Sequence, residues 1–322
     1  RRPAVGEPVD WSGWRKFLGR RDSFPQWSRL FAAELNEAPW RAVLDRWALR
    51  LAPGYSAAAT HGVIRVGHAA RGLAESETRV RLRELADALA SWAATYATLP
   101  EATPASPRRL GPRSAIAAVP LVPREQRGPG NIAAALGRLA EFPEFAPAID
   151  LVDLSGDPEA LVAALSEVFT RVYLANAVDT RSFIVFVHGV TAVHALGNLL
   201  PHVGAATGGA LARYAWQAGC GLLASFGGGT AMAEGIEPQD DDPSAQVDRA
   251  VTNGDEHIIK FTEACVARHK IAPSRVYPAA IRHALGVVGA ALTLPVRVPT
   301  SRATKRLPDF VEDQLGKGAR LR

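Results

Sequence analysis

The most apolar stretch of the chain, residues 182–200, reads SFIVFVHGVTAVHALGNLL and ends at a proline. It lies within 31 residues, between Arg181 and Arg213, that contain no Asp, Glu, Lys or Arg. That length would be enough to cross a bilayer. The same run, however, holds three histidines and an asparagine, which are unfavourable in lipid, and a proline and several glycines, which interrupt a helix. We therefore expect a buried core helix, a glycine-rich break at 204–209, and no membrane partner.

The rest of the chain has the composition of a helical globular protein. Hydrophobic residues make up 48% of the 322 residues and charged residues 21%, and alanine alone supplies 58. Alanine, together with leucine, arginine and glutamate, favours helix over strand. We predict an all-α fold without a nucleotide-binding sheet. The expected helices are 31–51, interrupted by Pro39, then 60–74, 75–96, 131–141, 157–175, 182–200, 210–225, 248–269 and 278–292.

Two segments depart from this helical pattern. Residues 99–130 contain seven prolines and little periodicity, which predicts a long irregular connection. The segment 295–322 is basic and polar, and we expect it to lie over the surface. With no internal repeat to divide the chain, we predict a single helical domain over residues 1–322.

Charge and cysteine content limit the partners and the compartment. The net charge is +5, but it is carried by 32 arginines and only five lysines, with no basic stripe interleaved with aromatic residues. We therefore expect no nucleic acid partner. Two cysteines cannot form a disulfide framework, and residues 1–18 lack the apolar core of a signal peptide. These features favour a reducing, cytoplasmic location.

Glycine-rich segments provide no dinucleotide fingerprint. Residues 227–229 are three glycines without the strand and helix that flank a phosphate-binding loop, and no P-loop motif is present. Gly219 and Gly221 sit inside an expected helix, where close helix packing explains them. Ser225 is outside a GxSxG elbow, which argues against a hydrolase. NADPH would therefore have to bind without a recognisable motif.

The histidines indicate possible metal chemistry. His61 and His68 are seven residues apart and share one helix face. His188 is flanked by apolar residues and has no charged residue within six positions, so its partner must come from elsewhere in the fold. Each of these histidines could be a hydrogen-bonded core or cap residue, or a metal ligand.

Residues 255–261, DEHIIKF, place His257 and Lys260 on one helix face. One interpretation of Lys260 is a surface lysine whose stem packs on apolar neighbours. The other is a buried lysine with a lowered pKa, whose neutral amine adds carbon dioxide and becomes a carboxylate-bearing ligand. Three or four imidazoles with such a carboxylate would suit Fe(II) and leave room for dioxygen or substrate.

Taken in order, five segments resemble the questin oxidase-like family, and the similarity spans residues 11–267. Each segment alone is a weak signal, but the ordered set is fairly specific. The segments are WRKFLG at 14–19, APG at 52–54, THGVIR at 60–65, VHGVT at 187–191 and DEHIIK at 255–260.

The resemblance implies an oxidoreductase of aromatic polyketide pathways that opens the rings of anthraquinones or related polycycles with dioxygen. It also implies a non-haem Fe(II) centre with histidine ligands and a carboxylated lysine. Carried over by position, the ligands and catalytic residues are His61, His188, His257 and Lys260. The family has a further Asn-His segment upstream, which residues 1–322 do not contain. That segment lies before Arg1, or His68 or His194 takes its place.

We therefore expect an iron-dependent oxygenase of an aromatic polyketide or anthraquinone-like phenol, acting by oxidative ring opening or hydroxylation. Trp and Phe side chains would line a flat apolar cavity for this small-molecule substrate. Arg65 would offset a phenolate or form an ordinary salt bridge. Two alternatives remain at this point: an NADPH- or flavin-assisted Baeyer–Villiger-type monooxygenase without protein metal, and a non-catalytic polyketide-binding protein. Neither the substrate nor the oligomeric state follows from the sequence.

Overall fold

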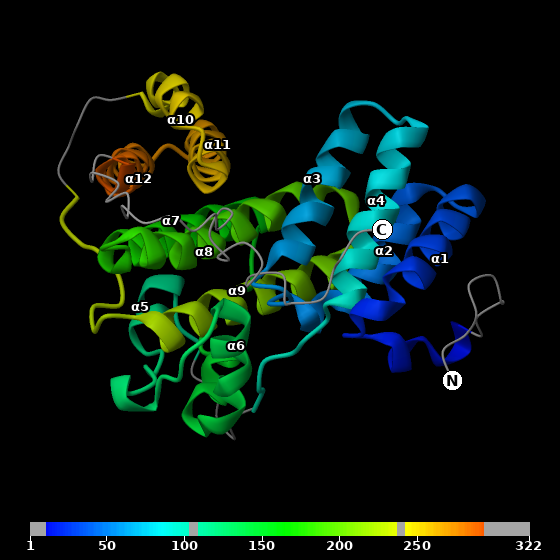
Figure 1. Ribbon diagram of the computed structural model, residues 1–322, viewed down its shortest axis with the longest axis horizontal. Coiled ribbons are helices and arrows are strands. Elements are labelled where there is room, and N and C mark those ends of the chain that lie inside the picture. The colour runs from blue at the N-terminus through cyan, green and yellow to red at the C-terminus, as the bar shows by residue number, and fades with distance from the viewer. Residues whose placement is uncertain (1–10, 103–108, 237–241, 293–322) are drawn as a thin grey trace, which may run out of the picture.

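The computed structural model describes residues 11–102, 109–236 and 242–292. Within these ranges the chain is built from helices and has no strand, apart from an isolated parallel bridge between Leu110 and Val152. The all-α prediction is confirmed. The α-helices, shown in Figure 1, are α1 (Phe24–Glu37), α2 (Trp40–Leu51), α3 (His61–Glu75), α4 (Arg79–Ala94), α5 (Pro112–Ala117), α6 (Ile132–Gly137), α7 (Pro158–Asn176), α8 (Thr180–Leu199), α9 (Ala205–Phe226), α10 (Val247–Asn253), α11 (Glu256–Ile271) and α12 (Val276–Leu292).

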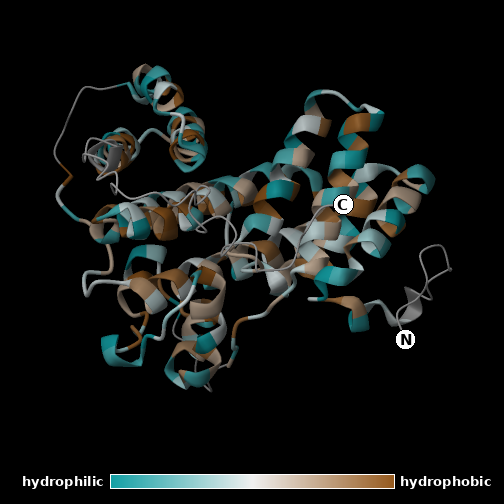
Figure 2. Ribbon diagram, in the orientation of Figure 1, coloured by the Kyte–Doolittle hydropathy of each residue, from teal (hydrophilic) through white to brown (hydrophobic). Residues whose placement is uncertain are grey.

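Helix α8 is the central element of the fold. It packs against α3, α7, α9 and α11, and nearly all of its side chains from Phe183 to Leu196 are buried. One helix of the described residues, Thr180–His202, is long and apolar enough to cross a membrane, but 78% of its most apolar window is buried inside the protein. That burial favours the core-helix interpretation. In Figure 2, the helices labelled α1 and α10 in Figure 1 carry both hydrophilic and hydrophobic residues.

The first helices pack around a cluster of aromatic rings. Trp14, from the 3₁₀ helix η1 (Trp11–Phe17), contacts Trp47 of α2, and Trp47 also contacts Trp27 and Phe31 of α1. Edge-to-face packing of this kind stabilises a core beyond its buried area. As predicted, the helical pattern is interrupted at Pro39, which precedes the first residue of α2.

Two predicted helix boundaries are wrong. Helix α9 has no break at 204–209: Gly204 caps it, and Gly208 and Gly209 lie inside its first turns. The alanine-rich sequence and the burial of this helix outweigh the helix-breaking tendency of glycine. Conversely, 248–269 is two helices, because Gly254 adopts φ +77° and ends α10. Asp255 then begins α11 by accepting hydrogen bonds from the backbone N–H groups of His257 and Ile258.

Glycines allow several helices to approach closely. A Cβ on Gly219 would lie 2.2 Å from the ring of Phe169, so α9 packs directly on α7, as the packing interpretation predicts. A Cβ on Gly67 would lie 2.9–3.1 Å from Cβ, Cα and the carbonyl oxygen of Ala195. Gly67 therefore sets the distance between α3 and α8.

The proline-rich connection is less irregular than expected. Within 99–130 the structure forms α5 and the short 3₁₀ helix Arg124–Gln126. The 3₁₀ helices Arg138–Glu141 and Pro143–Asp150 continue the chain between α6 and α7. The predicted basic tail, 295–322, lies outside the described residues.

The N-terminus of α8 provides a test of the fold. The Asp179 carboxylate accepts a hydrogen bond from the backbone N–H of Ser182, and the Ser182 hydroxyl oxygen accepts one from the backbone N–H of Asp179. Together these two bonds form a capping box. We expect Asp179→Ala to lower the free energy of unfolding by about 1 kcal/mol. The hydrogen bonds from Ser182 lower the pKa of Asp179 below its usual 3.8. The stability that the ionised cap contributes is therefore fully present above pH 3.8. It is lost as the pH falls through the lower pKa of the folded state. Urea unfolding across this range would show this acid-dependent loss in the wild type and its absence in Asp179→Asn.

Candidate metal centre

Three helices, α3, α8 and α11, carry the predicted ligands, and the structure brings two of them, His61 and His188, into contact. His61 of α3 contacts His188 of α8, and further along the same pair of helices Gly67 faces Ala195. The two helices therefore run in the same direction and in register. Helix α11 follows the same register, because His257 lies near His188 and Glu263 lies near His194. This arrangement creates two layers of polar side chains about 9 Å apart along the helices.

The first layer is centred on the His61–His188 pair. Their Nε2 atoms are 3.4 Å apart, and their rings meet edge to face with centroids 4.8 Å apart. The opposite nitrogens are both engaged by backbone oxygens at 2.6 Å: Nδ1 of His61 by Ala58, and Nδ1 of His188 by Ile184. Because a carbonyl only accepts, each Nδ1 carries the proton and each Nε2 carries a lone pair. Two unprotonated nitrogens this close repel each other unless a cation or a shared proton lies between them.

An unusual turn holds the His61 ring in place. Ala58, Ala59 and Thr60 have φ values of 48°, 56° and 70°, so three successive non-glycine residues adopt the left-handed conformation. Such backbone is strained, and strain of this kind concentrates at functional sites. Here it places the Ala58 carbonyl against His61 Nδ1. No signal in the sequence indicates this turn, because alanine and threonine do not favour it.

Desolvation favours the neutral form of both imidazoles, although only His188 is buried and His61 remains an exposed residue. Desolvation lowers the pKa of His188 to about 3, with the nearby His61 ring adding to the effect. Desolvation also lowers the pKa of His61, against the opposing influence of its hydrogen bond to Ala58. A neutral imidazole is the form that ligates a metal.

His257 completes the first layer from the α11 side. Its ring centroid lies 6.1 Å from that of His188, and its Nδ1 is 3.5 Å from a carboxylate oxygen of Asp255. The same carboxylate caps α11, so it also fixes the turn that carries His257. A carboxylate behind a histidine is a common orienting partner in metal sites. The adjacent acidic residues of DEHIIK were the available sequence signal for this role.

Lys260 is placed differently from the expectation. The carbamate interpretation requires a buried lysine, but the Lys260 side chain is 44% exposed and its Nζ lies 2.6 Å from Glu256 Oε2, one helical turn earlier. The first turns of α11 face solvent on this side, which lets the ammonium remain hydrated and paired. Lys260 does line a cavity of about 440 Å³ together with His61 and His68.

The second layer contains the two other histidines considered as ligands. Nε2 of His194 is 3.3 Å from Glu263 of α11, and the His68 ring lies 6.4 Å from that of His194. Glu263 also pairs with Arg71, at 2.5 Å. Burial raises the pKa of Glu263, but the contacts with His194 and Arg71 outweigh this effect and lower the pKa to about 2. Sequence reasoning missed Glu263, whose only signal was its position six residues after His257.

The cavity beside His61 lacks the expected aromatic lining. Its apolar residues include Ile64 and Ala69, and neither Trp nor Phe is among the residues that line it. The first five tryptophans lie in or next to η1, α1 and α2, and three of them, Trp14, Trp27 and Trp47, pack ring to ring in the core there. Arg65 forms a two-pronged salt bridge with Glu84, with the shorter contact at 2.7 Å, as the structural interpretation of this arginine predicted.

The geometry fits a metal at the histidine pair. Two imidazole nitrogens each about 2.1 Å from one ion lie about 3.0 Å apart at a right angle and about 3.4 Å apart at a tetrahedral angle, so the 3.4 Å between the two Nε2 atoms is close enough for a shared ion. Across the described ranges, no group of three or more His, Cys, Asp or Glu side chains is already arranged to hold an ion. Hence His61 and His188 are preorganised, whereas His257 and Lys260 would have to turn toward them.

Comparison with known proteins places the chain in a family. The family model described as questin oxidase-like matches residues 2–265, which include all four predicted ligands. The chain belongs to the questin oxidase-like family. The family name indicates an oxidoreductase with an aromatic small molecule as substrate. Among the curated proteins, the search finds no match.

Proposed function

We propose that this questin oxidase-like chain is a non-haem iron oxygenase that uses dioxygen to open or hydroxylate a ring of an anthraquinone-like polycyclic phenol. The observation that carries the proposal is the His61–His188 pair. Its two Nε2 atoms lie 3.4 Å apart, and both Nδ1 atoms are held by carbonyls. This is the arrangement in which a protein fixes the tautomer of a histidine ligand before the metal arrives.

In this proposal His61, His188 and His257 hold the iron, and Lys260 contributes a carboxylate as its carbamate. The bound iron would supply the redox chemistry that dioxygen needs. The protein contributes orientation: Ala58 and Ile184 direct the two Nε2 atoms inward, and Asp255 lies behind His257. The neighbouring cavity of about 440 Å³ is in the size range of small-molecule sites, and Ile64 and Ala69 give it apolar walls for a polycycle.

The proposed carbamate makes a prediction about Lys260. Carbon dioxide adds to the neutral amine with loss of one proton, so the ion pair with Glu256 opposes the reaction by stabilising the ammonium. We expect Glu256→Gln to raise carbamate occupancy in metal-free protein, seen as a ¹³C resonance after addition of labelled bicarbonate. Lys260→Ala should lose that resonance together with iron binding and activity, and bicarbonate should not rescue it. Lys270→Ala, at the exposed end of the same helix, is the matched control and should behave as wild type.

The activity itself is tested by order of addition. Iron-loaded protein is incubated with polycyclic phenols without oxygen, and oxygen is then admitted. We expect product only after oxygen, in the absence of NADPH. Equal turnover by metal-free protein, or turnover that requires stoichiometric NADPH, would contradict the proposal and favour the nicotinamide-dependent alternative.

A further inference from the structure

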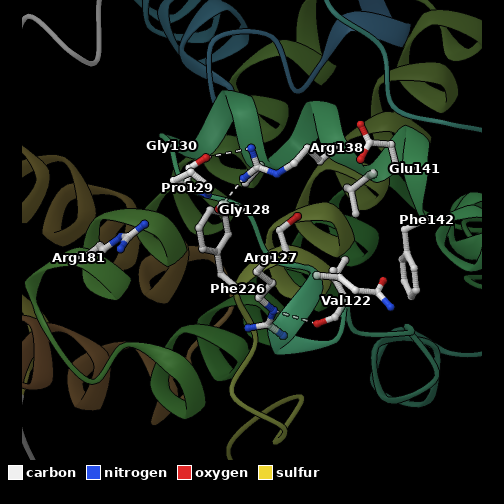
Figure 3. Close-up of a pocket in the computed structure, with 14 residues that line it drawn as sticks. Val122, Arg127, Gly128, Pro129, Gly130, Arg138, Glu141, Phe142, Arg181 and Phe226 are labelled. Atoms are coloured by element: carbon white, nitrogen blue, oxygen red, sulfur yellow. Dashed lines mark hydrogen bonds between the residues drawn. The ribbon is translucent and has the colours of Figure 1, made fainter.

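A second cavity, of about 590 Å³, lies away from the histidine layers. It is enclosed by the loop before α6, the 3₁₀ helix Arg138–Glu141, the end of α9 and the first turn of α8. Three arginines, Arg127, Arg138 and Arg181, line it, as Figure 3 shows. No residue lines both this cavity and the one beside His61.

Two of the arginines are fixed in place by backbone carbonyls. Arg127 donates to Val122 and Gly227, and Arg138 donates to Gly128 and Pro129. The loop approaches so closely that a Cβ on Gly128 would lie 3.1 Å from Arg138 Nε. A guanidinium has five N–H donors, and each of these arginines uses two of them in these bonds, so donors remain for a ligand.

No ion pair within the described protein neutralises the three arginines of the cavity. No carboxylate of those residues lies within 4.0 Å of a guanidinium nitrogen of the three, whereas Arg113 and Arg171 nearby both pair with Glu167. Glu141 lines the cavity but forms no ion pair there, and Asp179, whose charge acts on Arg181, is engaged by Ser182. Three cations against one carboxylate favour an anionic ligand.

The other residues that line the cavity favour a ligand that has a hydrogen-bonding group and an apolar part besides its negative charge. Ser225 also lines the cavity, is only 6% exposed, and its hydroxyl has no hydrogen-bond partner in the described structure. A buried hydroxyl of this kind usually has a partner, which a ligand would supply. Phe142 and Phe226 add apolar ring surface to the lining.

We propose that this cavity is a second binding site, which takes an aromatic carboxylate. The planar fork of a guanidinium matches a carboxylate, the Ser225 hydroxyl can donate to its second oxygen or to a ring substituent, and the phenylalanines contact the ring. Arg181 lies seven residues before His188, about 10 Å along α8, so the site is separate from the proposed metal centre. The inference does not depend on iron binding or on oxygenase activity.

Calorimetric titration of the full chain with 2-naphthoate tests the proposal. We expect 1:1 binding that weakens as salt is added, and much weaker binding of the neutral analogue 2-naphthamide. Arg181→Gln should weaken naphthoate binding by about tenfold, because it removes a charged partner. The Arg181 side chain is exposed and makes no hydrogen bond within the described residues, so the fold should persist. Ser225→Ala should weaken binding by a smaller factor.

Two controls separate the possible sites. Arg249→Gln removes the same charge from exposed α10 and should leave naphthoate binding unchanged. His188→Gln should also leave it unchanged, even if iron is lost. Equal affinity for naphthoate and naphthamide, equal affinity for inorganic phosphate, no effect of Arg181→Gln, or loss of binding in His188→Gln would each overturn the assignment.

Discussion

His188→Gln is expected to reduce iron affinity by more than about 100-fold and to abolish oxygenase activity. Loss of an orienting partner alone costs about 10–100-fold in metal affinity, and His188 is a direct ligand in our proposal. The glutamine side chain can still bond to the Ile184 carbonyl, so the buried position is not left empty. Iron titration of the purified variant, monitored by bound metal and by far-UV circular dichroism, separates loss of binding from loss of fold.

His202→Gln provides the matched histidine control. His202 packs against Trp40 at the end of α8, away from the first layer, and we expect wild-type iron binding from that variant. His194→Gln distinguishes the two layers: because His194 pairs with Glu263, its loss should affect stability more than iron affinity. If His188→Gln bound iron as wild type does, the pair would be a core hydrogen-bonding feature only.

Gly67→Ala is expected to lower both stability and iron affinity. The new Cβ would fall 2.9–3.1 Å from Ala195, including its backbone, so α3 has to move away from α8. Overpacking of this kind costs about 1–3 kcal/mol. The same movement separates His61 from His188, since the two pairs lie on the same two helices. We expect a lower melting temperature together with weaker iron binding.

Gly209→Ala is the matched control for this substitution. Gly209 lies inside α9, and a Cβ added there would have nothing within 4 Å, so alanine should stabilise the helix by up to about 1 kcal/mol. A loss of stability in Gly67→Ala together with a gain of stability in Gly209→Ala would support the packing argument. Unchanged iron affinity in Gly67→Ala would show that the α3–α8 spacing does not position the histidine pair.

Local patterns predict the helices more successfully than the site. The apolar run around His188 identifies the central helix, and Pro39 marks a helix boundary, because both depend on neighbouring residues alone. Gly208 and Gly209 mislead, because the surrounding alanines and tertiary packing keep them helical. The sequence leaves open whether Lys260 is buried, and the structure pairs it with Glu256 at the surface, since exposure depends on which face of α11 meets the rest of the fold.

The details of the candidate centre depend on contacts between distant segments. The motif order singles out His61, His188 and His257, but not the Ala58–Thr60 turn that holds His61, since its residues do not favour a left-handed conformation. Glu263 and the arginine-lined cavity are likewise invisible locally. The three cavity arginines come from separate segments, and only the fold brings Arg181 toward Arg127 and Arg138.

Elemental analysis of protein purified without chelator shows whether His61 and His188 hold iron. Wild-type protein is compared with the double variant His61→Gln/His188→Gln, with circular dichroism to establish that both are folded. The proposed iron centre requires about one iron ion per wild-type chain and almost none in the folded double variant. Equal iron in both proteins, or a metal-free wild type with full oxygen-dependent activity, would contradict it.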